Sequence, residues 1–424
     1  MANSNPRDAA IMKIKAKMEK AHPLFTDECC IYRVPHEIRK LNEDAYTPKV
    51  VSIGPFHHGN EKLVNMEGQK TMYFKEFIER TETKNLESFV SCVQELEPKV
   101  RGCYSDDIKL REEEHVMVIL VDCCFILEIL IRSYFHQRSS HDAFFLSPRL
   151  STYLKYDLLL LENQVPFFVL EKLYNLAFPS TSNPSLLTLT RSILPHVIIS
   201  GNRGGLSLTN VGRIAHFTDL TRKLLLLSSD LSISKCSREA HVTHLYSATQ
   251  LREAGVKFEV NKASKCLLDL QLSGHTFRIP FIRVEDFTEV VLRNLLAFEQ
   301  CHCMDEAYLT DFIFVIDFLI DTDKDVDLLI KKGIIENWLG DSNAVAKMFN
   351  GLAVNILTSD VNEKYCCILK GLNDFCEKPW NRKVATLKRD YCNTPWRTVA
   401  SIAAIFLLIL TVVQTVFSIL QVVL

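Results

Sequence analysis

The sequence predicts a mainly α-helical fold: a large helical body that carries a small antiparallel β-sheet insertion and ends in one C-terminal transmembrane helix. Apolar residues recur at helical spacing along most of the 424-residue chain. Alternation of apolar and polar residues is confined to one region, and the last 27 residues carry no charge. These three observations set the fold class, and the elements follow from them in chain order.

The first half of the chain predicts helices joined by short breaks. Ser105–Phe135 has acidic residues near its start, which suits the positive end of a helix dipole, and its middle is apolar on all sides. We therefore expect a central core helix there, while Asp122 and Glu128 interrupt the apolar run and argue against a membrane span. Further helices are expected over 11–20, 66–77 and 85–103.

Proline and glycine mark the breaks. Lys49–Ile53, which reads KVVSI, predicts a short strand that ends at a Gly-Pro turn. Pro166 divides the apolar stretch YLKYDLLLLENQVPFFVLEKLYNLAF into two helical pieces, with Glu-Asn-Gln at the junction. Residues 179–210 are rich in Ser, Thr, Pro and Gly and predict an exposed loop.

The second half predicts a small sheet followed by more helices. The alternating stretches are GVKFEVN, CLLDLQLSG and HTFRIPFIRVED, separated by turn residues. Helical spacing then predicts helices over 288–301, 308–319, 325–330, 342–357 and 361–376. We accordingly divide the chain into an N-terminal helical part (1–178), a variable loop or linker (179–240), a part with the sheet and C-terminal helices that packs with the first as one body (241–395), and an anchor (396–424).

Composition excludes several classes of protein. Net charge is −2 and the pI is about 6.7, whereas a nucleic-acid-binding protein usually has a basic excess, so no nucleic-acid partner is expected. Many of the 14 cysteines lie inside apolar runs such as VILVDCCFILEIL, as small buried hydrophobic residues do. The composition is that of a folded protein with reduced thiols, which places the body in the cytosol.

The C-terminal end predicts a membrane anchor. Thr398 to Leu424 is uncharged and longer than the roughly 20 apolar residues that a bilayer requires. The bases Arg382, Lys383, Lys388, Arg389 and Arg397 precede it, and basic residues beside a span stay on the cytosolic side. We expect a single-pass, tail-anchored protein in the plasma membrane or an endomembrane, with the lipid bilayer as one partner.

The turn Gly54, Pro55, Phe56, His57, His58 and Gly59 follows the predicted strand and is the leading candidate for chemistry. A metal site would recruit His36 and Cys29 or Cys30, and a catalytic site would need a nucleophile and an orienting carboxylate. Neither set is supplied by local spacing. We interpret the turn as structural, with no catalytic, cofactor-binding or metal-binding residue assigned.

Two other motifs fail their tests. DTDKDVD at Asp321–Asp327 has the acidic spacing of a calcium loop but lacks its glycine and its final glutamate, so it predicts an acidic start to the next helix. Cys301–Cys303, which reads CHC, lacks the second cysteine pair that structural zinc usually requires.

Several long strings together resemble the plant family called domain of unknown function 247. They include IYRVPHEIRKLNEDAYTPKVVSIGPFHHG, DLLLLENQVPFFVLEKLY, FRIPFIRVEDFTEVVLRNLLAFEQC and ATLKRDYCNTPWRTVASIAAIFLLILT. The similarity runs from about Ile31 to the C-terminus and fades over 179–240, and Cys392 replaces an expected aromatic residue. The resemblance implies a plant membrane protein without established enzymatic activity, and some members are linked to pollen–stigma recognition in grass self-incompatibility.

These observations lead to one main hypothesis and two alternatives. The main hypothesis is a membrane-anchored protein that acts by protein–protein interaction in recognition or signalling, with an unknown protein or small peptide as partner. The alternatives are an enzyme with a site around His57 and His58, and a structural membrane adaptor. A cleft with converging titratable groups would favour the enzyme, and an exposed apolar patch would favour the partner surface.

Overall fold

A computed structural model describes the greater part of the chain: residues 6–19, 26–81, 85–137, 144, 147–180, 183–194, 211–226, 244–264, 266–357, 361–381, 383, 386 and 395–423. The chain forms two compact units. Unit 1 comprises 1–35, 46–194 and 212–220, and unit 2 comprises 36–45, 195–211 and 221–424. The four-part division expected from the sequence stays a prediction.

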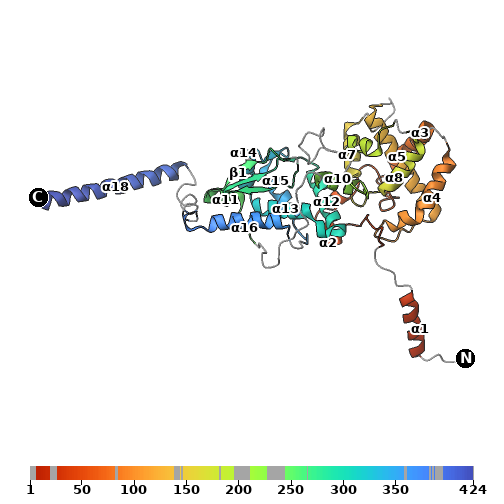
Figure 1. Cartoon of the computed structure of the whole chain (residues 1–424), viewed down its shortest axis with the longest axis horizontal. Helices are drawn as coiled ribbons and strands as arrows, with labels where there is room; N and C mark the ends of the chain where they lie inside the picture. Colours follow the sequence, from red (N-terminus) through yellow and green to blue (C-terminus); the bar gives the residue numbers. More distant parts are fainter. Residues whose placement is uncertain are drawn as a thin grey trace. The chain divides into compact units, whose positions relative to one another are not determined.

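Unit 1 is helical and is built around α5 (Glu112–Tyr134), as predicted. This helix packs against α3 (Glu67–Arg80), α4 (Leu86–Gly102) and α8 (Phe167–Ala177) (Figure 1). It also packs against α9 (Leu186–Ile193). The unit also contains α1 (Pro6–Glu19), η2 (Val64–Met66) and α7 (Pro148–Asp157), while α10 (Phe217–Leu226) continues from unit 1 into unit 2.

The core helix starts later than the sequence predicts. The guanidinium of Arg101 donates to the carbonyls of Ile108 and Leu110, over 2.6 and 3.2 Å, and this holds the approach to α5 in a non-helical form. Within α5 the two interrupting acids are buried and paired. Glu128 accepts hydrogen bonds from both Arg80 and Arg132, which satisfies a carboxylate that is otherwise inside the core.

The predicted strand at Lys49–Ile53 is wrong. These described residues belong to no ladder, because side chains instead of a neighbouring strand accept their backbone hydrogen bonds. The predicted exposed loop over 179–210 is wrong in part, since α9 buries Leu189 and Ile193 and packs on α5. Residues 181–182 and 195–210 lie outside the described residues.

Unit 2 surrounds two small sheets with helices. Its helical elements are α2 (His36–Arg39), α11 (Ala248–Ala254), α12 (Thr288–His302), η6 (Met304–Glu306), α13 (Tyr308–Leu319), α14 (Asp323–Lys331), α15 (Ser342–Leu352) and α16 (Glu363–Glu377). The short η1 (Glu43–Tyr46) begins in unit 2 and ends on the first residue of the second segment of unit 1. Among these, α13 packs against α12, α15 and α16, and α14 packs against α11 and α15. The mainly α class is thus confirmed.

The sheets differ from the predicted antiparallel arrangement. In the first, β3 (Thr276–Ile279) pairs antiparallel with β2 (Gln271–Ser273) but parallel with β1 (Lys257–Val260). In the second, β4 (Ile282–Val284) pairs parallel with β5 (Ile335–Asn337). Parallel pairing requires a connection longer than a hairpin turn, and α12 to α14 supply it between β4 and β5.

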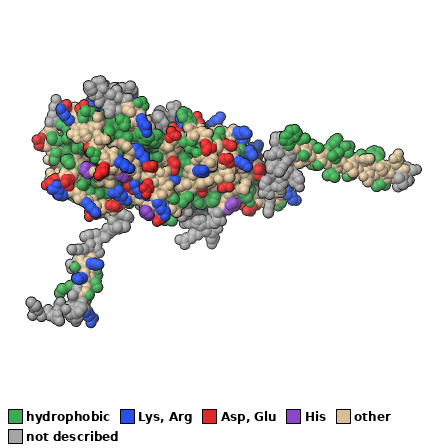
Figure 2. Space-filling view, turned by 180° about the vertical axis from the view of Figure 1, so that it is seen from behind, with side chains coloured by type: hydrophobic (Ala, Val, Ile, Leu, Met, Phe, Trp, Pro, Cys, Tyr) green, Lys and Arg blue, Asp and Glu red, His purple; other side chains and the backbone are tan. Residues whose placement is uncertain are grey.

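The C-terminal helix α18 (Pro395–Val423) contains one segment, Val399–Ile419, that is long and apolar enough to cross a membrane. None of this segment is buried within the protein, in contrast to the apolar core helix α5. Figure 2 shows apolar side chains at the surface of α18, whereas acidic and basic side chains are interspersed over the body.

Candidate functional site

The turn singled out in the sequence lies over a buried polar cluster in unit 1. Three successive backbone amides at residues 49–51 donate to the carboxylate of Asp157 over 2.7–3.0 Å. The amide of Ile53 donates to Asn163 over 2.8 Å, and that of Gly54 donates to Asp122 over 2.8 Å. Side chains from α5, α7 and the segment after α7 therefore replace a partner strand.

Gly54 is required by the shape of the turn. Its φ of +71° favours glycine, and a Cβ atom added there would lie 2.3 Å from the carbonyl oxygen of Gln164. The same carbonyl accepts a hydrogen bond from the hydroxyl of Tyr104 over 3.0 Å. The turn thus touches the 162–164 segment backbone to backbone, which no other residue type permits.

Lys70 forms a buried ion pair beneath the turn. Its ammonium lies 2.5 Å from Asp122 and 2.9 Å from Glu67, and it donates to the carbonyl of Ser52 over 2.9 Å. Burial lowers the pKa of Lys70, but Asp122 and Glu67 outweigh this and raise it. Burial raises the pKa of Asp122, which Lys70 partly offsets.

Lysine and serine neighbours can form a nucleophilic dyad, but the amine must then be neutral to act as a base. Lys70 is held in its charged form by two carboxylates, and it bonds to the Ser52 carbonyl instead of the hydroxyl. The arrangement fits a structural ion pair better than a general base.

The two adjacent histidines have different surroundings. His57 is buried and its Nε2 lies 3.5 Å from Glu162, whereas His58 is exposed. Glu162 is already engaged, because it accepts the amide of Val34 over 2.8 Å and the guanidinium of Arg33 over 3.2 Å. The imidazoles do not converge on one site, and the described residues contain no group of three or more potential metal ligands.

The polar residues of the LENQ segment (Leu161–Gln164) complete the cluster. Gln164 donates to the carbonyls of Leu158 and Leu160, and it accepts the amide of Phe217 over 3.0 Å. Sequence reasoning noticed the polar interruption of an apolar run but assigned it no role. Such an interruption was the one signal that could have predicted this cluster.

The remaining motifs have structural surroundings. Asp325 of the DTDKDVD stretch accepts the amide of Thr322 over 3.0 Å and closes a capping box at the start of α14. Cys303 caps the C-terminus of α12, where CHC ends.

Burial raises the pKa of Asp157 in the cluster beneath the turn to about 6, although the three amide hydrogen bonds that it accepts act to lower its pKa.

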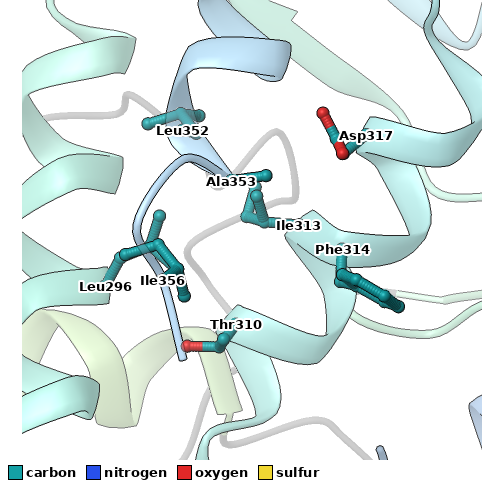
Figure 3. Close-up of a pocket in the computed structure, with 8 residues that line it drawn as sticks. All are labelled: Leu296, Thr310, Ile313, Phe314, Asp317, Leu352, Ala353 and Ile356. Carbon is teal, nitrogen blue, oxygen red and sulfur yellow. The ribbon is translucent and has the colours of Figure 1, made fainter. Parts of the chain in front are cut away.

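Unit 2 contains a pocket that sequence reasoning missed. About 140 Å³ in volume, it lies among α12, α13 and the end of α15 (Figure 3). Its apolar lining is Leu296, Ile313, Phe314, Leu352, Ala353 and Ile356, and its polar lining is Thr310 and Asp317. Burial, together with Asp321, raises the pKa of Asp317 to about 6. No sequence motif predicts this pocket, because its lining residues come from three separate segments and are mostly apolar positions of the kind found in any helical core.

Of the predicted membrane-flanking bases, Lys383 is exposed and Arg397 lies in the first turn of α18. Arg382, Lys388 and Arg389 lie outside the described residues. Trp396 is 83% exposed, as an aromatic side chain at a membrane interface would be.

Comparison with known proteins gives the family. A sequence model of the plant proteins of unknown function named DUF247 matches residues 31–410. The chain belongs to this family. The match confirms the resemblance and includes the turn, the LENQ segment and about half of the anchor.

Two curated Arabidopsis thaliana relatives align over most of the DUF247 chain. UPF0481 protein At3g47200 is 30% identical over 421 residues, which is 93% of this chain and 87% of the relative. Putative UPF0481 protein At3g02645 is 24% identical over 500 residues, which is 95% of this chain and 92% of the relative. No solved structure matches.

Proposed function

We propose that this DUF247 protein is a single-pass membrane protein whose body faces the cytosol and acts by binding other proteins in recognition or signalling. The observation that carries the proposal is the Val399–Ile419 segment, which is apolar, long enough to span a bilayer and not buried in the protein. Basic residues before the segment support the cytosolic orientation of the body.

The cluster beneath the turn supports a binding role over an enzymatic one. Its charged groups are committed to one another: Lys70 pairs with Asp122, and Asp157 accepts backbone amides. A catalytic group must instead reach a substrate and be able to exchange a proton with it. In this proposal the cluster fixes the shape of unit 1, and His57 and His58 carry out no reaction.

Proximity labelling in the native membrane tests the proposal. The labelling enzyme is fused to the full chain, and the control is the same enzyme fused to residues 383–424 alone. We expect a reproducible set of neighbours that depends on the body. Identical sets from the full chain and from the anchor would contradict a protein-binding role and favour a passive adaptor.

A further inference from the structure

The pocket of unit 2 has room for one compact apolar group. Its volume of about 140 Å³ is close to that of engineered apolar cavities, roughly 150 Å³, that accept a benzene ring. The walls come from three elements: Leu296 on α12, Ile313 on α13, and Ile356 just after α15 (Figure 3). A leucine, methionine or phenylalanine side chain matches this size and lining.

One charged group at this pocket has no partner within the part of the chain that the structure describes. Asp317, one helical turn beyond Ile313, forms no hydrogen bond or ion pair with any described residue, although it is partly buried. The other polar lining residue is satisfied, because the Thr310 hydroxyl donates to Glu299 over 2.8 Å. A cationic group from a partner would offset the cost of desolvating this carboxylate.

The surface beside the pocket is apolar and held in place. Val354 and Leu357 are 45% and 71% exposed. Reciprocal hydrogen bonds of 2.8 and 3.0 Å join Gln300 to the backbone of Leu357, and Asn355 donates to the carbonyl of Glu37 over 2.8 Å. A small ligand that fits inside the pocket would leave these exposed apolar side chains in water. A longer chain segment could fill the pocket and cover them as well.

We propose that this pocket docks a segment of a partner protein in which one bulky apolar residue fills the cavity and an adjacent lysine or arginine pairs with Asp317. This inference rests on the proposed protein-binding function and names the chemistry of the partner. Val354 and Leu357 then cover the flanks of the bound segment, as the near-neutral rim of a hot spot does.

Peptide display on the full chain in lipid nanodiscs tests the inference. Random heptapeptides are selected on the wild-type chain and on three variants: Asp317→Asn, which keeps the shape and removes the charge; Ala353→Leu, which fills the pocket; and Asp374→Asn, an exposed acid of α16 outside the pocket, as the matched control. Thermal unfolding of each variant checks that it is folded.

The wild type and Asp374→Asn should both enrich an apolar residue next to lysine or arginine. Asp317→Asn should lose the basic preference and bind the selected peptides about tenfold more weakly, the usual weight of one charge-assisted pair. Ala353→Leu should remove the enrichment. No enrichment on the wild type, or an unchanged basic preference with Asp317→Asn, would overturn the inference. Because Asp317→Asn preserves the shape of the side chain, its result remains decisive even if Ala353→Leu does not fold.

The same Ala353→Leu chain separates this inference from the proposed function. If proximity labelling with it finds the partners of the wild-type chain, the pocket is not the docking site but the protein-binding role stands. If the wild-type chain itself labels only the neighbours of its anchor, the protein-binding role fails.

Discussion

Replacing Lys70 with methionine would remove the cation of a buried ion pair and leave its partner in the core. The ammonium of Lys70 lies 2.5 Å from Asp122, and both side chains are at most 2% exposed. Among the residues that the structure describes, Asp122 would keep only the amide of Gly54 as a hydrogen-bond donor. Removing one member of such a pair costs about 3–5 kcal/mol, because the other charge stays buried without compensation.

The assay is thermal unfolding of the full chain in detergent, followed by circular dichroism. For a unit of this size about 1 kcal/mol corresponds to 2–4 °C, so Lys70→Met should lower the Tm of unit 1 by about 6–20 °C. Lys75→Met is the matched control on the same helix, since Lys75 is 75% exposed and lies 3.8 Å from Glu79. It should change the Tm by no more than about 2 °C.

The loss of stability that Lys70→Met causes should also depend on pH. Burial raises the pKa of Asp122 above its ordinary value, and loss of Lys70 removes the charge that opposes this. The folded variant then holds a proton that the unfolded chain releases. Stability is therefore greatest below the ordinary carboxyl pKa and falls as pH rises through the raised pKa, so the deficit should be larger at pH 8 than at pH 5. Equal Tm values for Lys70→Met and Lys75→Met at both pH values would refute the reasoning.

Three further predictions concern the turn and its cluster. Gly54→Ala should lower the free energy of unfolding of unit 1 by more than about 2 kcal/mol, because the added Cβ atom clashes with the Gln164 carbonyl and the backbone conformation is strained. The control is Gly59→Ala, at a position with a similar φ of +78° but open space around it, which should cost about 1 kcal/mol. Equal costs in denaturant titrations would contradict the contact with the 162–164 segment. Burial raises the pKa of Asp157 to about 6, so the contribution of this carboxyl group to the free energy of unfolding falls as pH rises from about 4 to 6. Asp157→Asn should therefore flatten the plot of unfolding free energy against pH over this range, and an unchanged slope would contradict the prediction. His57→Ala should lower the free energy of unfolding by about 1–3 kcal/mol and His58→Ala by about 0.5 kcal/mol or less, because only His57 is buried. Elemental analysis of the wild type should find no stoichiometric zinc. About one zinc per chain, lost in the double variant, would indicate a metal site instead.

Sequence reasoning located the helices because their apolar periodicity is local. The bounds of α13 match the expected 308–319, and the core role of α5 follows from its apolar middle. Parallel pairing could not be predicted from alternation, because β4 and β5 join residues 53 positions apart, such as Ile282 and Ile335. Strand β5 itself is three residues long and carries too little pattern to be recognised.

The predicted strand at Lys49–Ile53 failed for a related reason. Its apolar pattern correctly indicated burial, but the acceptors of its amides are side chains more than 100 residues away, such as Asp157 and Asn163. Spacing along the chain carries no record of such contacts. The same holds for the pocket, because its acid, Asp317, is one polar position within a helix of the expected bounds 308–319, and helical spacing does not show what it faces.

We propose that α18 anchors a cytosolic body in a membrane, and glycosylation mapping tests this topology. A glycosylation acceptor tag added after Leu424 is compared with the same tag placed within 195–210, beyond the end of α9. The basic residues before the span predict that the first tag crosses the membrane and is modified, while the second stays in the cytosol and is not. Modification of the internal tag and not of the terminal one would contradict the topology, and with it the cytosolic, protein-binding role proposed for the body.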